Sequence, residues 1–213
     1  MTIRKRAGSV MFIAAAAAAV VGMSVGPALA STSLTVKVKG GGSYTASSTK
    51  QTVLSDNGVN VTCKSSKGSG KIANGTHHGA APVSVGTVAK LSFSKCSSLL
   101  GAVTTTVHGK PELKANSKTN SKGETDAIIT GVDVTVQIKS AGCSLTVTGT
   151  APGYYTNKTH TLTMTTKLPV KASTKASLTI GDVSGCDGVV TNGQHPTYTT
   201  VYKVSKRVSI KSS

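Results

Sequence analysis

The sequence predicts an all-β fold, either an antiparallel β-sandwich or a Greek-key barrel, with two disulfides. Short runs in which apolar and polar residues alternate recur along the chain, and Gly, Asn, Ser or Pro separates them. Thr, Val, Ser and Gly are abundant, and Trp is absent. No stretch beyond residue 30 sustains the apolar period of a helix. We therefore expect helices to be short or absent there.

Residues 1–30 have the pattern of a signal peptide. Three basic residues precede an alanine-rich apolar run, and Ala28-Leu29-Ala30 supplies small residues for cleavage before Ser31. The run is short for a bilayer span, and no cysteine follows it to carry a lipid. We expect a single β-rich extracellular domain over residues 31–213, which is secreted and has no transmembrane segment after signal cleavage.

In the first half of this domain, the sequence pattern predicts strands that are interrupted by two exposed loops. Alternation or β-branched residues place strands at 33–39, 52–63, 83–96 and 103–107. Within the second of these runs, Asp56-Asn57-Gly58 is a turn signal. Residues 64–82 and 114–125 are rich in Ser, Lys, Gly and Asn and lack apolar periodicity, so we expect a loop at each.

The second half begins with a predicted hairpin. Residues 127–138 and 143–147 both alternate and flank a short connection at 139–142. Ala151-Pro152-Gly153 is expected to break the chain. Further strands are expected around 162–164, 168–170, 176–180, 197–205 and 208–211.

The four cysteines predict two disulfides, because all of them lie in the exported part and meet an oxidising environment. Four cysteines permit three connectivities, and spacing alone does not choose among them. We favour Cys63–Cys96 and Cys143–Cys186, each of which closes a loop of a few dozen residues and contributes about 3–4 kcal/mol. The sequence lacks the closely spaced C-x-x-C pairs that are typical of zinc sites. No metal or other cofactor is therefore expected.

The net charge of +17 becomes +14 when the three basic residues of the signal are removed. Most of this charge is Lys, spread among Ser and Thr, and it lacks the clustered Arg and aromatic residues that bind bases. Nucleic acid is therefore not an expected partner. We expect anionic cell-wall polymers or an extracellular protein instead. Alternatively, the lysines keep the surface soluble and protect sheet edges.

Candidate binding residues follow from the expected loop at 64–82 and from two tyrosine groupings. The candidates are Lys64, Lys67, Lys71, His77, His78, Tyr154 and Tyr155. Adjacent histidines in an extended chain point to opposite sides, so His77 and His78 make a poor metal pair. The tyrosines, with Tyr198 and Tyr202 as a second grouping, either stack on a sugar or partner or pack at the rim of the fold. No catalytic residue is predicted, because no nucleophile motif is present and acids are few.

The chain resembles uncharacterised secreted proteins of actinobacteria. The resemblance is carried by Gly142-Cys143, Val147-Thr148-Gly149, Tyr155-Thr156-Asn157, Leu168-Pro169-Val170, Gly185-Cys186-Asp187-Gly188-Val189-Val190 and Tyr202-Lys203-Val204, together with Cys63 and Cys96 in the first half. It implies export and cysteines paired within each half. It implies no activity.

The residues favour a secreted non-catalytic protein, a cell-envelope-associated or binding module with a cationic surface. A secreted protease or enzyme inhibitor that presents the loop at 64–82 is the first alternative. A secreted hydrolase is the second, and it requires a pocket that a sequence does not reveal. The ligand, the partner and the oligomeric state stay open.

Overall fold

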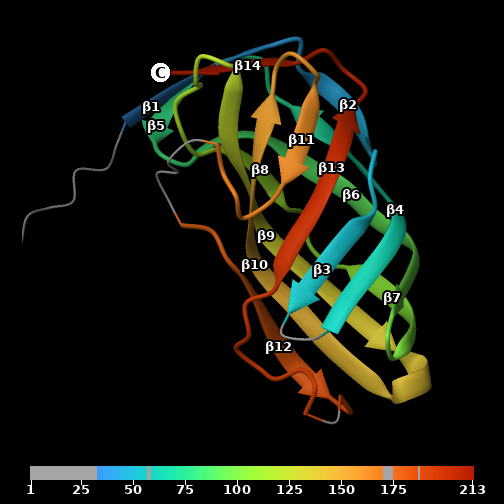
Figure 1. Cartoon of the computed structure of the whole chain (residues 1–213). Coiled ribbons are helices and arrows are strands. Elements are labelled where there is room, and N and C mark those ends of the chain that lie inside the picture. The colour runs from blue at the N-terminus through green and yellow to red at the C-terminus, as the bar shows by residue number, and fades with distance from the viewer. Residues whose placement is uncertain (1–32, 57–58, 170–174, 187) are drawn as a thin grey trace, which may run out of the picture. The chain divides into compact units, whose positions relative to one another are not determined.

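The computed structural model describes residues 33–56, 59–169, 175–186 and 188–213, so the predicted signal peptide lies outside the described residues. The all-β prediction is confirmed (Figure 1), since the helical content of this part is one short 3-10 turn, η1 (Lys139–Ala141). The strands are β1 (Ser33–Lys39), β2 (Gly42–Ser48), β3 (Thr52–Asp56), β4 (Val59–Ile72), β5 (Gly75–Ala80), β6 (Val83–Ser98), β7 (Gly101–Val107), β8 (Glu112–Ala115), β9 (Glu124–Ile138), β10 (Cys143–Thr156), β11 (Thr161–Met164), β12 (Leu178–Ser184), β13 (Thr197–Val204) and β14 (Ser209–Ser212).

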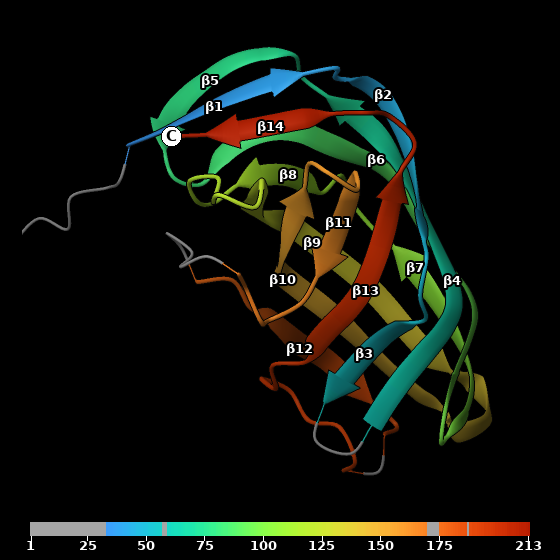
Figure 2. The ribbon, with the colours of Figure 1, turned by 45° about the horizontal axis from the view of Figure 1, so that its top comes forward.

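Eleven of these strands form one antiparallel sheet that closes on itself. Three pairs of short strands, β2 with β3, β7 with β8 and β11 with β12, each lie along the same neighbouring strand, so the ring has eight positions. Pairing of β9 with β10 and of β13 with β2 and β3 completes the ring. We call it the closed sheet (Figure 2).

Each position of the closed sheet pairs with the next one along the chain, which is an up-and-down order. The expected antiparallel strands are present, but their connections are not those of a Greek key. Short connections favour pairing of consecutive strands. Alternation reports which face of a strand is buried and carries no information about strand order.

A second, three-stranded sheet, ordered β14-β1-β5, covers one end of the closed sheet (Figure 2). Its central strand β1 turns apolar side chains inward, and Leu34, Val36 and Val38 are at most 2% exposed. Asn157 fastens β14 with two hydrogen bonds, from Asn157 Nδ2 to the Ile210 carbonyl at 2.8 Å and from the Ile210 amide to Asn157 Oδ1 at 2.7 Å.

Two disulfides lie toward the opposite end and confirm the predicted pairing. Cys63–Cys96 joins β4 to β6, and Cys143–Cys186 joins the start of β10 to the segment that follows β12. Cys96 also lies opposite Val103, and Cys143 lies opposite Ile138. All six side chains are buried, so this end is filled by a cross-strand row of small and medium apolar groups.

The prediction of an exposed loop at residues 64–82 is wrong. The residues up to Ile72 belong to β4, and residues 75–80 form β5. Strand β4 is held on both edges, by β2 and β3 on one side and by β6 on the other, and these ladders outweigh its poor apolar pattern. Gly70 is needed within the strand, because a Cβ there would meet the carbonyl oxygen of Thr87 and the ring of Tyr44.

The second expected loop, 114–125, is shorter and less exposed than predicted. Strand β8 continues to Ala115 and β9 begins at Glu124. Between them, Asn116 and Ser117 are buried. The expected break at Ala151-Pro152-Gly153 is also absent, because all three residues lie within β10 and are buried.

Candidate functional site

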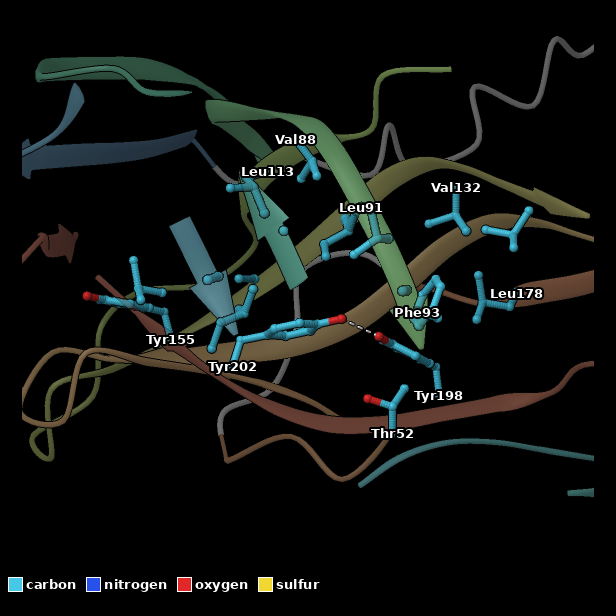
Figure 3. A pocket seen from close by; sticks show the side chains of 18 of the residues that line it. Thr52, Val88, Leu91, Phe93, Leu113, Val132, Tyr155, Leu178, Tyr198 and Tyr202 are labelled. Carbon is cyan, nitrogen blue, oxygen red and sulfur yellow. Dashed lines mark hydrogen bonds between the residues drawn. The ribbon is translucent and has the colours of Figure 1, made fainter. Parts of the chain in front are cut away.

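The closed sheet contains a cavity of about 140 Å³ (Figure 3). Its wall is built from inward-facing side chains of both halves of the chain, and Ile210 of β14 closes part of one end. Closed antiparallel sheets with about eight strands have an interior that side chains just fill or that holds one small ligand. This cavity is therefore the candidate functional site.

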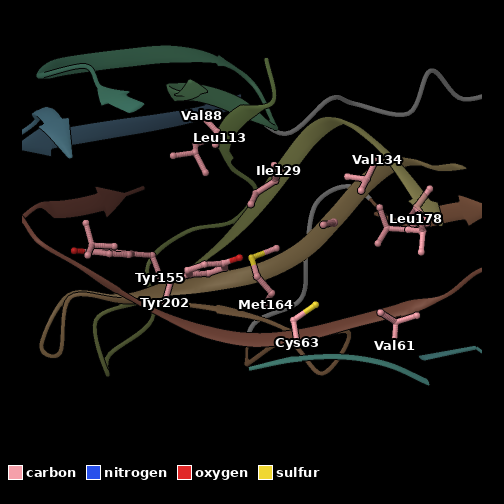
Figure 4. Close-up of a cluster of buried hydrophobic side chains, with 14 of the residues drawn as sticks. Val61, Cys63, Val88, Leu113, Ile129, Val134, Tyr155, Met164, Leu178 and Tyr202 are labelled. Carbon is pink, nitrogen blue, oxygen red and sulfur yellow. The ribbon is translucent and has the colours of Figure 1, made fainter. Parts of the chain in front are cut away.

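The cavity follows from the size of the residues that point inward. Most inward positions carry Val, Ala, Thr or Gly, and Phe93 is the one phenylalanine of the lining. Figure 4 shows the surrounding apolar cluster, in which Val61, Val134, Leu178 and Met164 approach from different strands. Such short side chains do not fill the interior of the ring, which leaves a largely apolar void.

Tyrosine hydroxyls and a hydroxyl cluster are the main polar groups of the wall. Tyr198 and Tyr202 share a hydrogen bond of 2.6 Å (Figure 3). Beside them, Thr52 hydrogen bonds to Ser66 at 2.9 Å and to Thr200 at 3.0 Å, and all three are almost fully buried. Burial raises the pKa of Tyr198 and of Tyr202, so both phenols stay neutral at physiological pH.

Tyr44 and Tyr155 also direct their hydroxyls to protein partners. The Tyr155 hydroxyl donates to the carbonyl of Val208 at 2.8 Å, and the Tyr44 hydroxyl donates to the carbonyl of Thr87 at 3.2 Å. Burial raises the pKa of each phenol to about 12. The hydroxyl protons of these tyrosines are thus committed to protein acceptors, and the cavity presents mainly hydrocarbon to an occupant.

The cavity lining offers few side chains that could act as a general acid or base. Among the described residues that line it, none is a carboxylate, a histidine or a free thiol. The one charged lining residue, Lys114, forms an ion pair with Glu112 at 3.1 Å. Elsewhere in the described part of the chain, no three His, Cys, Asp or Glu side chains gather as metal ligands. The arrangement is suited to holding an apolar molecule.

The predicted lysines lie outside the cavity. Lys64, Lys67 and Lys71 are exposed on the outer face of β4, where they are joined by Lys90 and Lys95 of β6. The register places Lys67 opposite Ser92 and Lys90 opposite Ser69. The structure thus brings lysines of two neighbouring strands together on one outer face of the closed sheet, which we call the lysine face.

The histidines and tyrosines that were predicted as binding residues do not gather at one site. His77 donates to the carbonyl of Ala73 at 3.2 Å, whereas His78 hydrogen bonds to Thr35 at 3.0 Å across to β1. Tyr155 lines the cavity, and its neighbour Tyr154 is not among the lining residues. Tyr155 thus faces the cavity, as do Tyr198 and Tyr202 of the second tyrosine grouping.

The sequence pattern did not reveal most of the cavity residues. An apolar position on the inward face of a strand has the same pattern whether it fills a core or lines a cavity. Alternation did identify inward faces, such as Val132, Val134 and Val136 on β9. The scarcity of large aromatic residues was the one signal that such a core would be incompletely filled.

Membrane-spanning helices and similarity to known proteins give no additional indication of function. None of the helical segments in the described ranges has the length and hydrophobicity needed to cross a bilayer. Comparison of the chain with protein-family models, with curated proteins and with solved structures finds no match.

Proposed function

We propose that this protein is a secreted, non-catalytic binding module that holds one small apolar molecule inside its closed sheet. The apolar cavity is the observation that supports this function. An empty apolar void lowers stability, because the side chains around it lack the contacts that a filled interior would supply. A ligand that fills the void restores the lost contacts, so binding and folding reinforce each other. The two disulfides offset part of the cost of the unfilled interior.

The test is titration of the oxidised protein with octan-1-ol, a neutral apolar probe, by isothermal calorimetry. Saturable one-to-one binding is expected. Val134→Phe places a ring in the cavity, so it should abolish binding and raise the free energy of unfolding by about 0.5–2 kcal/mol. Gln137→Phe is the matched control, because it adds the same ring to an exposed position of the same strand.

Two results would contradict the proposal. One is an absence of octan-1-ol binding to the unsubstituted protein. The other is a loss of about 1–3 kcal/mol in Val134→Phe, which is the penalty for overpacking an interior that is already full.

A second function is favoured by the lysine face. Neither β4 nor β6 contains an Asp or Glu, and their exposed positions are occupied by Lys, Ser, Thr, Ala and Asn. A basic face rich in hydroxyl groups suits an anionic cell-wall polymer. Both functions are compatible in one molecule, because the lysines point away from the cavity.

Retention on isolated cell walls tests this second function. Exposed charge attraction is screened by salt, so retention should fall as the salt concentration rises. The triple variant Lys64→Gln/Lys67→Gln/Lys71→Gln should be retained less at low salt. Retention that ignores both salt and these substitutions would refute an electrostatic role for the lysine face.

A further inference from the structure

The wall of the closed sheet opens between β6 and β7. Cys96 pairs with Val103 near one end of these strands, and Thr87 pairs with Glu112 of β8 near the other end. Residues 88–95 and 104–111, equal in number, lie between these points and form no ladder with each other. The register is therefore the same on both sides of the gap. We call this gap the side slit.

Both margins of the side slit are held in place by their other neighbours. On β6, Lys90 to Ser94 remain paired with β4. On β7, Thr104 to Val107 remain paired with β9. The slit is closed at one end by the Cys96 pair and at the other by a hydrogen bond from the Val88 amide to the Pro111 carbonyl at 2.8 Å. The side slit is therefore bounded at both ends.

Side chains at the margins connect the slit with the cavity. Leu91 and Phe93 on β6 and Thr105 on β7 all line the cavity, and all three are partly exposed. Figure 3 shows Leu91 and Phe93 beside the cavity on the same strand as Val88. Val88, at the closed end of the slit, is buried. The partly exposed apolar residues thus lie where the ladder is missing.

Positive charge surrounds the outer side of the slit. Lys90 and Lys95 are exposed on β6, and Lys110 is exposed on the opposite margin with His108 nearby. The nearest acids are Glu112 and Asp133, and Glu112 is paired with Lys114. Lys110 precedes Pro111, and Lys90 follows Val88 by two residues, so both lysines lie beside the Val88–Pro111 hydrogen bond.

We propose that the side slit admits the ligand and that the ligand is a medium-chain carboxylate, with its chain in the cavity and its carboxylate between Lys90 and Lys110. The inference rests on the proposed function. A cavity of about 150 Å³ accommodates benzene, so the 140 Å³ present here suits a short hydrocarbon chain. An anionic head group at the slit keeps its hydration and gains attraction to the lysines, whereas burial inside would strip it of water.

The experiment compares octanoate with octan-1-ol by calorimetry on the oxidised protein. Octanoate should bind more tightly, and added salt should weaken its binding but not that of octan-1-ol. The double variant Lys90→Gln/Lys110→Gln should lower octanoate affinity about fivefold and leave octan-1-ol affinity unchanged. Hexanoate should bind more weakly than octanoate by about fourfold for each methylene removed.

Lys203→Gln is the matched control, because Lys203 is an exposed lysine on β13, away from the slit. Equal affinities for octanoate and octan-1-ol, with no effect of the double variant, would overturn the inference and leave the proposed function standing. Binding of neither probe would overturn both. An equal loss of octanoate affinity in Lys203→Gln would show that the attraction is general and does not belong to the slit.

Discussion

At the scale of single residues, the tyrosines combine an apolar ring with a hydroxyl that has a defined partner. Tyr155 links the wall of the closed sheet to the chain just before β14 through the Val208 carbonyl. Tyr198 and Tyr202 bond to each other, and the Tyr198 ring also contacts Phe93 edge-on, with the ring centroids 6.3 Å apart. These residues supply the aromatic rings of a core that has no Trp.

The raised tyrosine pKa values make stability fall at alkaline pH. In the unfolded chain Tyr44 and Tyr155 ionise near pH 10, whereas in the folded protein the pKa of each is about 12. Between these values the unfolded state binds fewer protons, so the stabilisation present below pH 10 is lost as pH rises through 12. Urea unfolding midpoints measured from pH 9 to 12 should decrease across this window. The decrease should be smaller in Tyr155→Phe, and a constant midpoint would contradict the assignment.

At the scale of elements, β4 shows how neighbours impose a strand on a sequence that resembles a loop. Ladders on both edges hold its Ser, Lys and Gly residues in extended conformation. Its glycines differ in their surroundings. A Cβ at Gly70 would strike the carbonyl oxygen of Thr87, whereas a Cβ at Gly68 would make ordinary contacts, the nearest at 3.7 Å to the carbonyl oxygen of Lys90.

The two glycines of β4 therefore form a matched pair of tests. Gly70→Ala should lower the free energy of unfolding by about 1–3 kcal/mol, because the β6 backbone has to move. Gly68→Ala should be neutral or slightly stabilising, because alanine restricts the unfolded chain without a clash. Chemical denaturation of both variants measures the difference. Equal effects would mean that close backbone approach does not determine the need for glycine in this strand.

At the scale of the whole described domain, closure of the sheet and incomplete filling of its interior are linked. The closed sheet leaves few unpaired edges, so the strands are stabilised by ladders even where their side chains are small. Disulfides near one end and the three-stranded sheet over the other limit access along the axis. Access through the wall at the side slit is consistent with both ends being covered.

Much of the local structure could be predicted from the sequence. Alternation identified the hairpin of β9 and β10, the strand β1 and the inward faces of β9, because burial of one side of a strand is a local property. The cysteine pairing was favoured correctly. The part of β4 after Cys63 was missed because its stability comes from β2 and β6 rather than from its own residues.

The sequence by itself determined the strand class, the disulfide-forming residues, the basic charge and the small size of the side chains that point inward. Only the tertiary structure decided the up-and-down order, the closure by β13 with β2 and β3, the side slit and the gathering of lysines on β4 and β6. The physical reason is that strand partners are chosen by non-local hydrogen bonding and register, and the same alternation fits many strand orders.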